Sequence, residues 1–348
     1  MRPLTNALAA GTLILAATGL ASGAHADGEV NVYSYRQPDL IKPLLDAFQK
    51  ETGVTANVLF LDKGLVERIQ AEGANSPADV ILTVDISRLT EAKDAGVTQS
   101  VKSEIIDSDI PAQYRDPDGN WFGLTTRGRV VYASKERVPE TEITYEDLAD
   151  PKWKGRICTR DGQHSYNIGL FASMLARHGE AETEKWLTGL KNNLAKKPDG
   201  SDRDQAKAIF AGECDIALGN TYYVGLMMTN EKEPEQKEWA SAIKVLFPNS
   251  NDRGTHVNIS GMAMAKNAPN KENAQKLMDF LASGEAQEIY AEQVFEYPVM
   301  PGKEPADIVK GFGQIKPDTL PLSEIAANRK KASELVDKVG YNDGPAGE

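Results

Sequence analysis

Cysteine and histidine are both scarce in this sequence. Its 348 residues include two cysteines, Cys158 and Cys214, and four histidines. Two thiols are too few for a closed all-cysteine zinc site. No pair of histidines follows the H-E-x-x-H pattern of zinc peptidases, and neither a G-x-S-x-G elbow nor a P-loop is present. These absences argue against zinc enzymes, serine hydrolases and nucleotide-hydrolysing enzymes.

Long apolar runs are confined to the N-terminus. Arg2 is followed by an apolar segment from about residue 7 to residue 20, and Ala24-His25-Ala26 fits a small-x-small cleavage site. The segment is short for a membrane anchor, which is the alternative. We therefore predict a signal peptide over residues 1–26 and an exported, periplasmic chain that starts near Asp27 and does not insert into the membrane. No lipobox cysteine stands at the predicted cut.

An excess of basic residues is also lacking. The chain has 39 Lys and Arg against 51 Asp and Glu, with a formal net charge of −12. Such a chain is a poor partner for nucleic acid or anionic lipid and suits a cationic ligand. We expect no nucleic-acid partner. Low-complexity tracts and solenoid repeats are absent as well.

Strand-like and helix-like segments alternate along the first part of the chain. The strand-like segments are residues 30–35, 55–61 and 78–85, rich in Val, Ile and Leu. Between them, Leu40, Leu44 and Phe48 recur at helical spacing, and a second helix is predicted to end at Gly73. This β-α-β-α-β order predicts a parallel sheet with helices on both faces.

A second block, over residues 145–220, also alternates helix-like and strand-like segments. Two such blocks predict two lobes with a ligand cleft between them. The expected elements of the second block are a helix then a turn over residues 145–153, strands at 154–160 and 214–220, and helices at 167–179 and 202–213. Clefts of this kind lie at the carboxyl ends of strands. We predict a first lobe of residues 27–126 and 256–301 and a second lobe of 127–255 and 302–348. The crossing strands would be 124–132 and 255–261.

Three tyrosines follow predicted strands at the start of predicted helices. Tyr222 and Tyr223 come after a bend expected at Gly219, and Tyr166 occupies the equivalent place downstream of Cys158. A disulfide between the two cysteines would hold these junctions together. A hard, highly charged cation deprotonates phenols and binds phenolate oxygen, and Fe³⁺ fits this best. From the residues alone, aromatic side chains lining a cleft for a sugar or an amine remain an open alternative.

Four segments, residues 30–54, 78–89, 144–169 and 214–227, resemble the periplasmic ferric-ion-binding proteins of ABC iron transporters. The resemblance runs over essentially the whole exported chain and includes the run Asn220-Thr221-Tyr222-Tyr223 with a single upstream Tyr166. It implies two α/β lobes joined by crossing strands that close on Fe³⁺. It also implies delivery to a membrane permease driven by a separate ATPase.

Carried over by position, the resemblance implies that Tyr166, Tyr222 and Tyr223 are phenolate ligands. Gln37 and Pro38 stand where other members have a His-Tyr pair, so those ligands are missing here. The pattern resembles the subgroup that uses tyrosines together with a small anion such as carbonate.

Two arginines are candidates to hold that anion, namely Arg36 and Arg127. An arginine binds a planar anion through two parallel hydrogen bonds. A surface or interlobe ion pair is the alternative for each residue. Tyr35, Gln37 and Asn220 are expected around the site. Tyr35 would either reach the metal or pack, and Gln37 would hydrogen-bond at the cleft edge.

We therefore predict a monomeric ferric-ion solute-binding protein that is not an enzyme. One rival is a solute-binding protein for a polyamine, a sugar or an oxyanion. Another is an exported enzyme with a tyrosine acid or base, but no partnered Asp or His stands near these motifs in the sequence.

Overall fold

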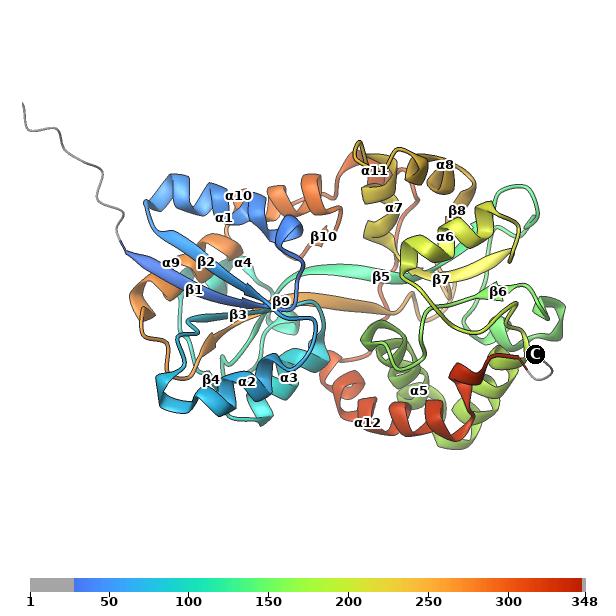
Figure 1. Cartoon of the computed structure of the whole chain (residues 1–348), viewed down its shortest axis with the longest axis horizontal. Helices are drawn as coiled ribbons and strands as arrows, with labels where there is room; N and C mark the ends of the chain where they lie inside the picture. The colour runs from blue at the N-terminus through green and yellow to red at the C-terminus, as the bar shows by residue number, and fades with distance from the viewer. Residues whose placement is uncertain (1–27, 346–348) are drawn as a thin grey trace, which may run out of the picture.

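The molecule has two α/β lobes that lie side by side (Figure 1). This architecture comes from a computed structural model that describes residues 28–345, so the predicted signal segment 1–26 lies outside the described residues. The predicted two-lobed fold with crossing strands is confirmed. Among the helices of the described range, none has both the length and the apolar character needed to cross a bilayer.

The first lobe begins with the predicted parallel sheet, in the order β2-β1-β3. Its strands are β1 (Glu29–Ser34), β2 (Thr55–Phe60) and β3 (Val80–Thr83), and its helices are α1 (Pro38–Thr52), α2 (Leu65–Glu72) and α3 (Ile86–Asp94). Helix α1 buries Leu44 and Phe48, as the spacing predicts, and ends at Gly53. That glycine takes the left-handed conformation (φ 73°) and donates its N–H to the Gln49 carbonyl.

The C-terminal part of the first lobe returns to the same sheet from much later in the chain. Strand β9 pairs antiparallel with β3, a reversal that the sequence did not indicate. The elements of this part are β9 (Val257–Ala265), α9 (Lys271–Ala282), α10 (Gly284–Ile289), the π-helix η5 (Tyr290–Val294) and β10 (Tyr297–Pro298). The N-terminal part of the lobe also contains β4 (Thr98–Gln99), α4 (Glu104–Asp109) and the 3₁₀ turns η1 (Gly73–Asn75) and η2 (Ala112–Tyr114). Helices α9 and α10 pack against α1.

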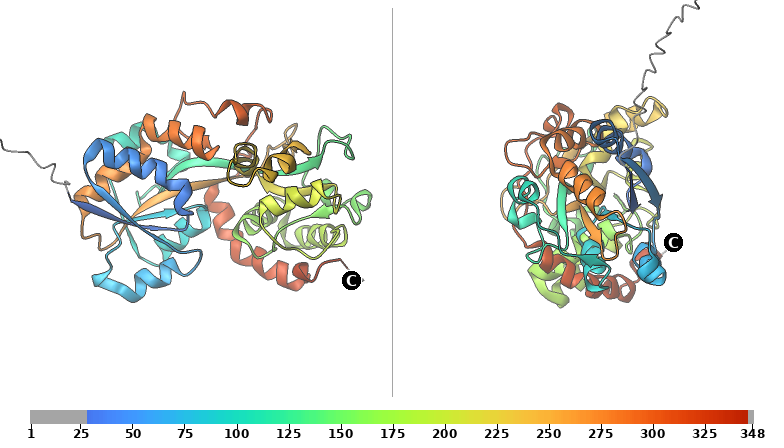
Figure 2. Two further views of the ribbon diagram at one scale, coloured as in Figure 1. Left: turned by 45° about the horizontal axis from the view of Figure 1, so that its top comes forward. Right: turned by 90° about the vertical axis from the view of Figure 1, so that its left-hand side faces the viewer.

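Strand β5 (Phe122–Ser134) connects the lobes, and all of its residues are buried. Residues 122–128 of β5 pair with β9 in the first lobe. Residues 129–134 pair with β7 (Ile216–Asn220) and β8 (Ile243–Leu246) in the second. In Figure 2, β5 and β9 run side by side from one lobe toward the other. The exact division at residues 126, 256 and 301 stays a prediction.

The second lobe packs helices around the short parallel pair β6 (Ile157–Cys158) and β7. Its helices are α5 (Ser165–Asn192), α6 (Asp202–Phe210), α7 (Thr221–Met228), α8 (Glu235–Ser241), α11 (Asp307–Lys310) and α12 (Leu322–Lys338), with the 3₁₀ turns η3 (Glu146–Ala149), η4 (Pro151–Trp153) and η6 (Tyr341–Asp343). Helix α5 breaks at Gly179, where the sequence predicted a helix end. The helix and turn predicted over 145–153 are two short 3₁₀ turns, and Pro151 lacks the N–H that would continue an α-helix.

A disulfide joins the end of β6 to the segment that leads into β7. Cys158 ends β6, Cys214 lies two residues before the start of β7, and their Cα atoms are 5.9 Å apart. The two strands are parallel neighbours, so the helices that follow them, α5 and α7, begin on the same side of the lobe. The predicted pairing of the only two cysteines is confirmed.

Replacing both cysteines with alanine is expected to lower the free energy of unfolding by about 4 kcal/mol. The bridge spans 56 residues, and a cross-link of that length removes much of the entropy of the unfolded chain. Urea unfolding of the metal-free protein measures the change. A loss below about 1 kcal/mol would mean that the bridge adds little to stability.

Candidate metal centre

The junction between β7 and α7 directs two tyrosines toward the cleft. Asn220 has extended backbone angles (φ −92°, ψ 144°) and is the N-cap of α7, which begins at Thr221. The bend is therefore at Asn220, and the prediction of a bend at Gly219 is wrong. Gly219 lies inside β7, where a Cβ atom would come within 2.1 Å of the Tyr132 ring. This glycine is needed for close packing rather than for a turn.

The start of α5 is shaped by His164, a residue that the sequence analysis did not assign. Its Nδ1 accepts the backbone N–H of Tyr166 at 3.2 Å, which caps the helix. The His164 ring also meets the Tyr166 ring edge-on, with centroids 4.6 Å apart. Burial, reinforced by the charge of Arg160, lowers the pKa of His164 to about 3. The imidazole is thus neutral, as its role as an acceptor requires.

The three predicted tyrosines come together. The hydroxyl oxygens of Tyr166 and Tyr222 are 3.1 Å apart, and the rings of Tyr222 and Tyr223 lie 4.2 Å apart. All three side chains are buried and line one cavity of about 150 Å³. Burial first, and then the neighbouring Tyr166, raises the pKa of Tyr222 and of Tyr223 above the ordinary value. Both stay protonated at neutral pH until a strongly charged cation displaces the protons.

The opposite wall of this cavity belongs to the first lobe. It includes Tyr35, Gln37 and Arg88, so the site lies between the lobes. Gln37 is exposed at the cavity, where the sequence placed it at the cleft edge. The Tyr35 hydroxyl accepts the backbone N–H of Leu65, and its ring lies 3.7 Å below the Arg88 guanidinium. This arrangement favours the packing alternative for Tyr35.

A cluster at the crossing strands holds both predicted anion-binding arginines. We call it the hinge cluster, and its members are Arg36, Thr125, Arg127, Ser260 and Glu296. Arg36 pairs with Glu296 at 2.6 Å and donates to Ser260. Arg127 donates through Nη1 to Ser260 Oγ at 3.1 Å. Glu296 also accepts from Ser260 at 2.9 Å and from Thr125. Arg36 thus forms a buried ion pair with Glu296 of the same lobe, which is neither a surface nor an interlobe pair, while still lining the cavity.

Glu296 could not be predicted from the sequence, because no motif or periodic pattern around it marks a site residue. Burial alone would raise the pKa of its carboxyl, but the charges of Arg36 and Arg127 hold that pKa below its usual value. Burial would likewise lower the pKa of Arg36, and the charge of Glu296 instead raises it. Both groups are therefore ionised.

A second buried cluster surrounds Asp202, and we call it the Asp202 cluster. Asp202 pairs with Arg129 at 2.8 Å and with Arg160 at 3.1 Å, and accepts the backbone N–H of Asn220 at 2.8 Å. The Asn220 side chain accepts from Arg129 at 3.1 Å. Asn220 therefore supports the site from within the protein and does not line the cavity. The segment that supplied Tyr166 also contains Arg160, a signal that the sequence analysis did not use.

These clusters surround the tyrosines with positive charge. The guanidinium carbons of Arg160 and Arg127 lie 5.2 Å and 5.6 Å from the centre of the Tyr166 ring. Arg203 lies 4.9 Å from the Tyr223 ring centre. Each cluster combines two arginines with one carboxylate, so each carries one net positive charge. Positive charge of this kind favours the phenolate form of nearby tyrosines over the phenol.

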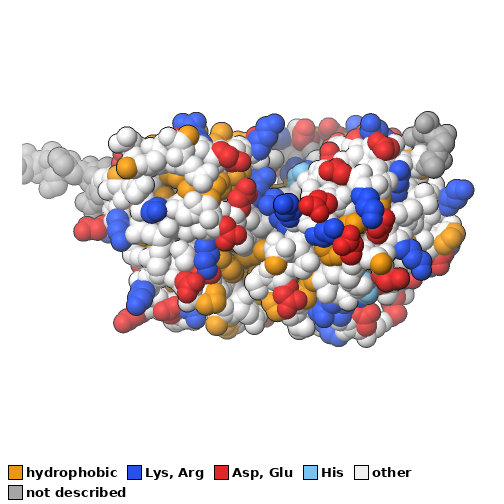
Figure 3. Space-filling model, turned by 90° about the horizontal axis from the view of Figure 1, so that it is seen from below, with side chains coloured by type: hydrophobic (Ala, Val, Ile, Leu, Met, Phe, Trp, Pro, Cys, Tyr) orange, Lys and Arg blue, Asp and Glu red, His pale blue; other side chains and the backbone are white. Residues whose placement is uncertain are grey.

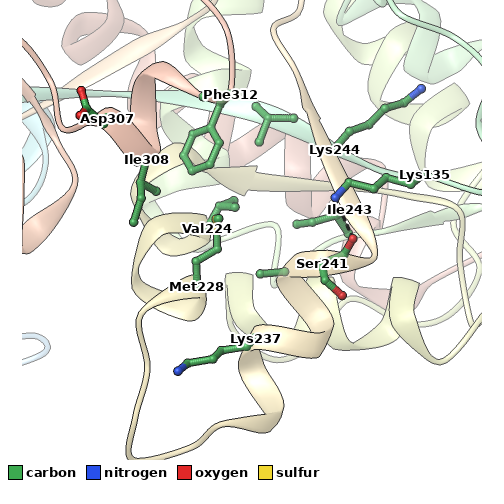
Figure 4. A pocket seen from close by; sticks show the side chains of 13 residues that line it. Lys135, Val224, Met228, Lys237, Ser241, Ile243, Lys244, Asp307, Ile308 and Phe312 are labelled. Atoms are coloured by element: carbon green, nitrogen blue, oxygen red, sulfur yellow. Dashed lines mark hydrogen bonds between the residues drawn. The ribbon is translucent and has the colours of Figure 1, made fainter.

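A larger cavity lies against another face of α7 and does not suit a metal. It measures about 560 Å³ and is lined mainly by apolar side chains, including Val224, Met228 and Phe312, together with lysines (Figure 4). One of these, Lys135, donates to the Ser241 carbonyl. Within residues 28–345, no group of three or more His, Cys, Asp and Glu is placed to hold a metal ion. The tyrosine cavity is therefore the candidate centre.

The surface carries charges of both signs. On the face in Figure 3, acidic and basic side chains are interspersed over both lobes.

Comparisons with known proteins match nearly the whole described chain. The family model described as bacterial extracellular solute-binding protein matches residues 75–311. Iron uptake protein A1 of Synechocystis sp. is 43% identical over 316 residues, which cover 90% of this chain and 87% of that protein.

Two solved structures are similar in fold and sequence. Apo ferric ion-binding protein A of Pasteurella haemolytica has a TM-score of 0.88 and 51% identity, over 92% of this chain and 99% of that one. The Trichodesmium protein IdiA (FutA), in complex with iron and citrate ligands, has a TM-score of 0.84 and 44% identity. The match covers 90% of this chain and all (100%) of that one.

Proposed function

The chain belongs to the bacterial extracellular solute-binding proteins, and from this premise we propose that it binds ferric iron between its lobes. Tyr166, Tyr222 and Tyr223 are the proposed ligands, through their phenolate oxygens. The observation that carries the proposal is the convergence of three buried phenols on one small cavity. The similar proteins named for iron uptake and ferric-ion binding support it.

The donor chemistry selects a hard trivalent cation. Calcium and magnesium prefer carboxylate and carbonyl oxygen, and zinc prefers sulfur and imidazole. Within the described residues, Asp62 is the only carboxylate on the cavity lining and His164 the only imidazole, and the Nδ1 of His164 is already used in the helix cap. Phenolate ligands therefore favour Fe³⁺ over these metals.

The charges favour a small anion beside the iron. Three phenolates balance Fe³⁺, so an added anion such as carbonate needs positive partners. The hinge cluster and the Asp202 cluster supply one net positive charge each. Arg36 and Arg160 line the cavity and Arg127 does not. The Nη2 of Arg127 is buried without a hydrogen-bond partner among the described residues, and we propose it as a further donor for that anion. The same positive charge disfavours a polyamine in this cavity.

The proposed setting is the periplasm, with delivery of iron to an ABC permease. Family membership supports binding outside the cytoplasm and transport rather than catalysis. We propose that the protein works as a monomer that presents its loaded cleft to the permease.

A visible spectrum tests this function directly. Metal-free protein mixed with one equivalent of Fe³⁺ as a weak chelate, in bicarbonate buffer, is expected to develop a phenolate-to-iron absorption band that saturates at one iron per chain. Ga³⁺, which has no such band, serves as the control metal. A colourless mixture that loses its iron on gel filtration would rule the proposal out.

A further inference from the structure

Glu296 is a buried carboxylate that the iron site does not need as a ligand. Its side chain has no exposed surface, and it does not line the tyrosine cavity. Its three donors come from three segments: Arg36 follows β1, Thr125 lies on β5 and Ser260 lies on β9. Burying a charge costs several kcal/mol before its partners offset it. The carboxylate of Glu296 has hydrogen-bond donors from all three segments at the junction of the lobes. We therefore ask how its negative charge affects the net charge beside the tyrosine cavity.

The backbone holds Glu296 in one place. The preceding π-helix η5 is a rare element, and Phe295 has the left-handed conformation (φ 61°), which is costly for a residue with a side chain. The Phe295 ring packs closely against Gly225 of α7, where a Cβ atom would come within 2.5 Å of it. Phe295 also shares an apolar cluster with the three tyrosines. The position of Glu296 is thus coupled to the helix that carries Tyr222 and Tyr223.

We propose that Glu296 is an internal counter-ion that limits the negative charge of the anion accompanying iron. It neutralises Arg36, so the hinge cluster presents one net positive charge to the cavity instead of two. Arg127 keeps the buried Nη2 that has no partner among the described residues. This inference rests on the proposed function, because it concerns the anion that binds with iron in the same site.

Removing the negative charge of Glu296 is expected to strengthen anion binding, and more so for a dianion than for a monoanion. An extra unit of positive charge about 1 nm away, at an effective dielectric constant of about 20, strengthens binding of a monoanion by about 15-fold and of a dianion by about 250-fold. A role that was only structural would weaken both anions alike.

The test compares sulfate with formate on the iron-loaded protein. Each anion is titrated while the visible band is followed, in the wild type and in Glu296→Gln. The variant is expected to bind sulfate about 250-fold and formate about 15-fold more tightly, so the ratio of the two affinities rises about 15-fold. Glu296→Asp keeps the charge and is expected to stay within about threefold of the wild type for both anions. The matched control is Glu146→Gln, which breaks a 2.8 Å ion pair with Arg253 elsewhere in the second lobe and should change neither affinity.

The outcomes separate this inference from the proposed function. An unchanged ratio of sulfate to formate affinity in Glu296→Gln, with a normal iron band, overturns the counter-ion role and leaves iron binding intact. A wild-type protein without an iron band defeats the proposed function itself. If Glu296→Gln does not fold, the double variant Arg36→Gln/Glu296→Gln removes both charges and keeps the net charge of the cluster. Its sulfate-to-formate ratio should stay near the wild-type value, and a tenfold shift would refute the inference.

Discussion

Tyr222→Phe is expected to lower the affinity for ferric iron by more than about 100-fold, because losing even an outer-shell partner of a metal ligand costs 10–100-fold. Tyr222 lies between the other two phenols: its oxygen is 3.1 Å from that of Tyr166, and its ring stacks on Tyr223. Phenylalanine keeps the packing and removes only the oxygen. Competition with a chelator measures the affinity, and the visible band should weaken and shift.

The matched control is Tyr35→Phe, which removes a phenol from the opposite wall of the same cavity. Its hydroxyl accepts the Leu65 N–H, so the expected change in iron affinity is less than about threefold. Equal losses in the two variants would mean that Tyr35 is a ligand too. A Tyr222→Phe variant that keeps the wild-type band and affinity would remove Tyr222 from the metal site.

Asp202→Asn is expected to lower the free energy of unfolding of the metal-free protein by about 3–5 kcal/mol. The substitution leaves Arg129 and Arg160 buried without their shared negative partner. Burial alone would raise the pKa of Asp202, but these two arginines hold it below its ordinary value, so the carboxylate is ionised at neutral pH. Urea unfolding measures the loss of free energy. The wild type provides the reference dependence of the unfolding free energy on urea concentration.

Asp204→Asn, on the same helix, is the matched control. Asp204 accepts the backbone N–H of Ser201 in a capping box at the exposed start of α6. Losing a cap costs about 1 kcal/mol. If Asp202→Asn destabilised the protein no more than Asp204→Asn does, the Asp202 cluster would not be the buried electrostatic support that its geometry indicates.

Local patterns account for what could be predicted of the fold. Helical spacing and the terminating glycines indicated α1 and α2, and apolar runs indicated β1, β3 and β7. The antiparallel return of β9 could not be predicted, because strand direction depends on how distant segments pack. The bend expected at Gly219 was wrong for a related reason. The sequence does not reveal that the Tyr132 ring fills the space beside this glycine.

The sequence by itself determined the three candidate ligands and the cysteine pair. Tyr222 and Tyr223 lie next to each other at a strand-to-helix junction, and Tyr166 lies at another, so short-range rules sufficed to place them at helix starts. Only the tertiary structure decided the charges around them. Arg36 and Glu296 are 260 residues apart, and Arg129 meets Asp202 across 73 residues. Such contacts form only when the crossing strands bring remote segments together, because a buried ion pair depends on three-dimensional packing and leaves no periodic pattern along the chain.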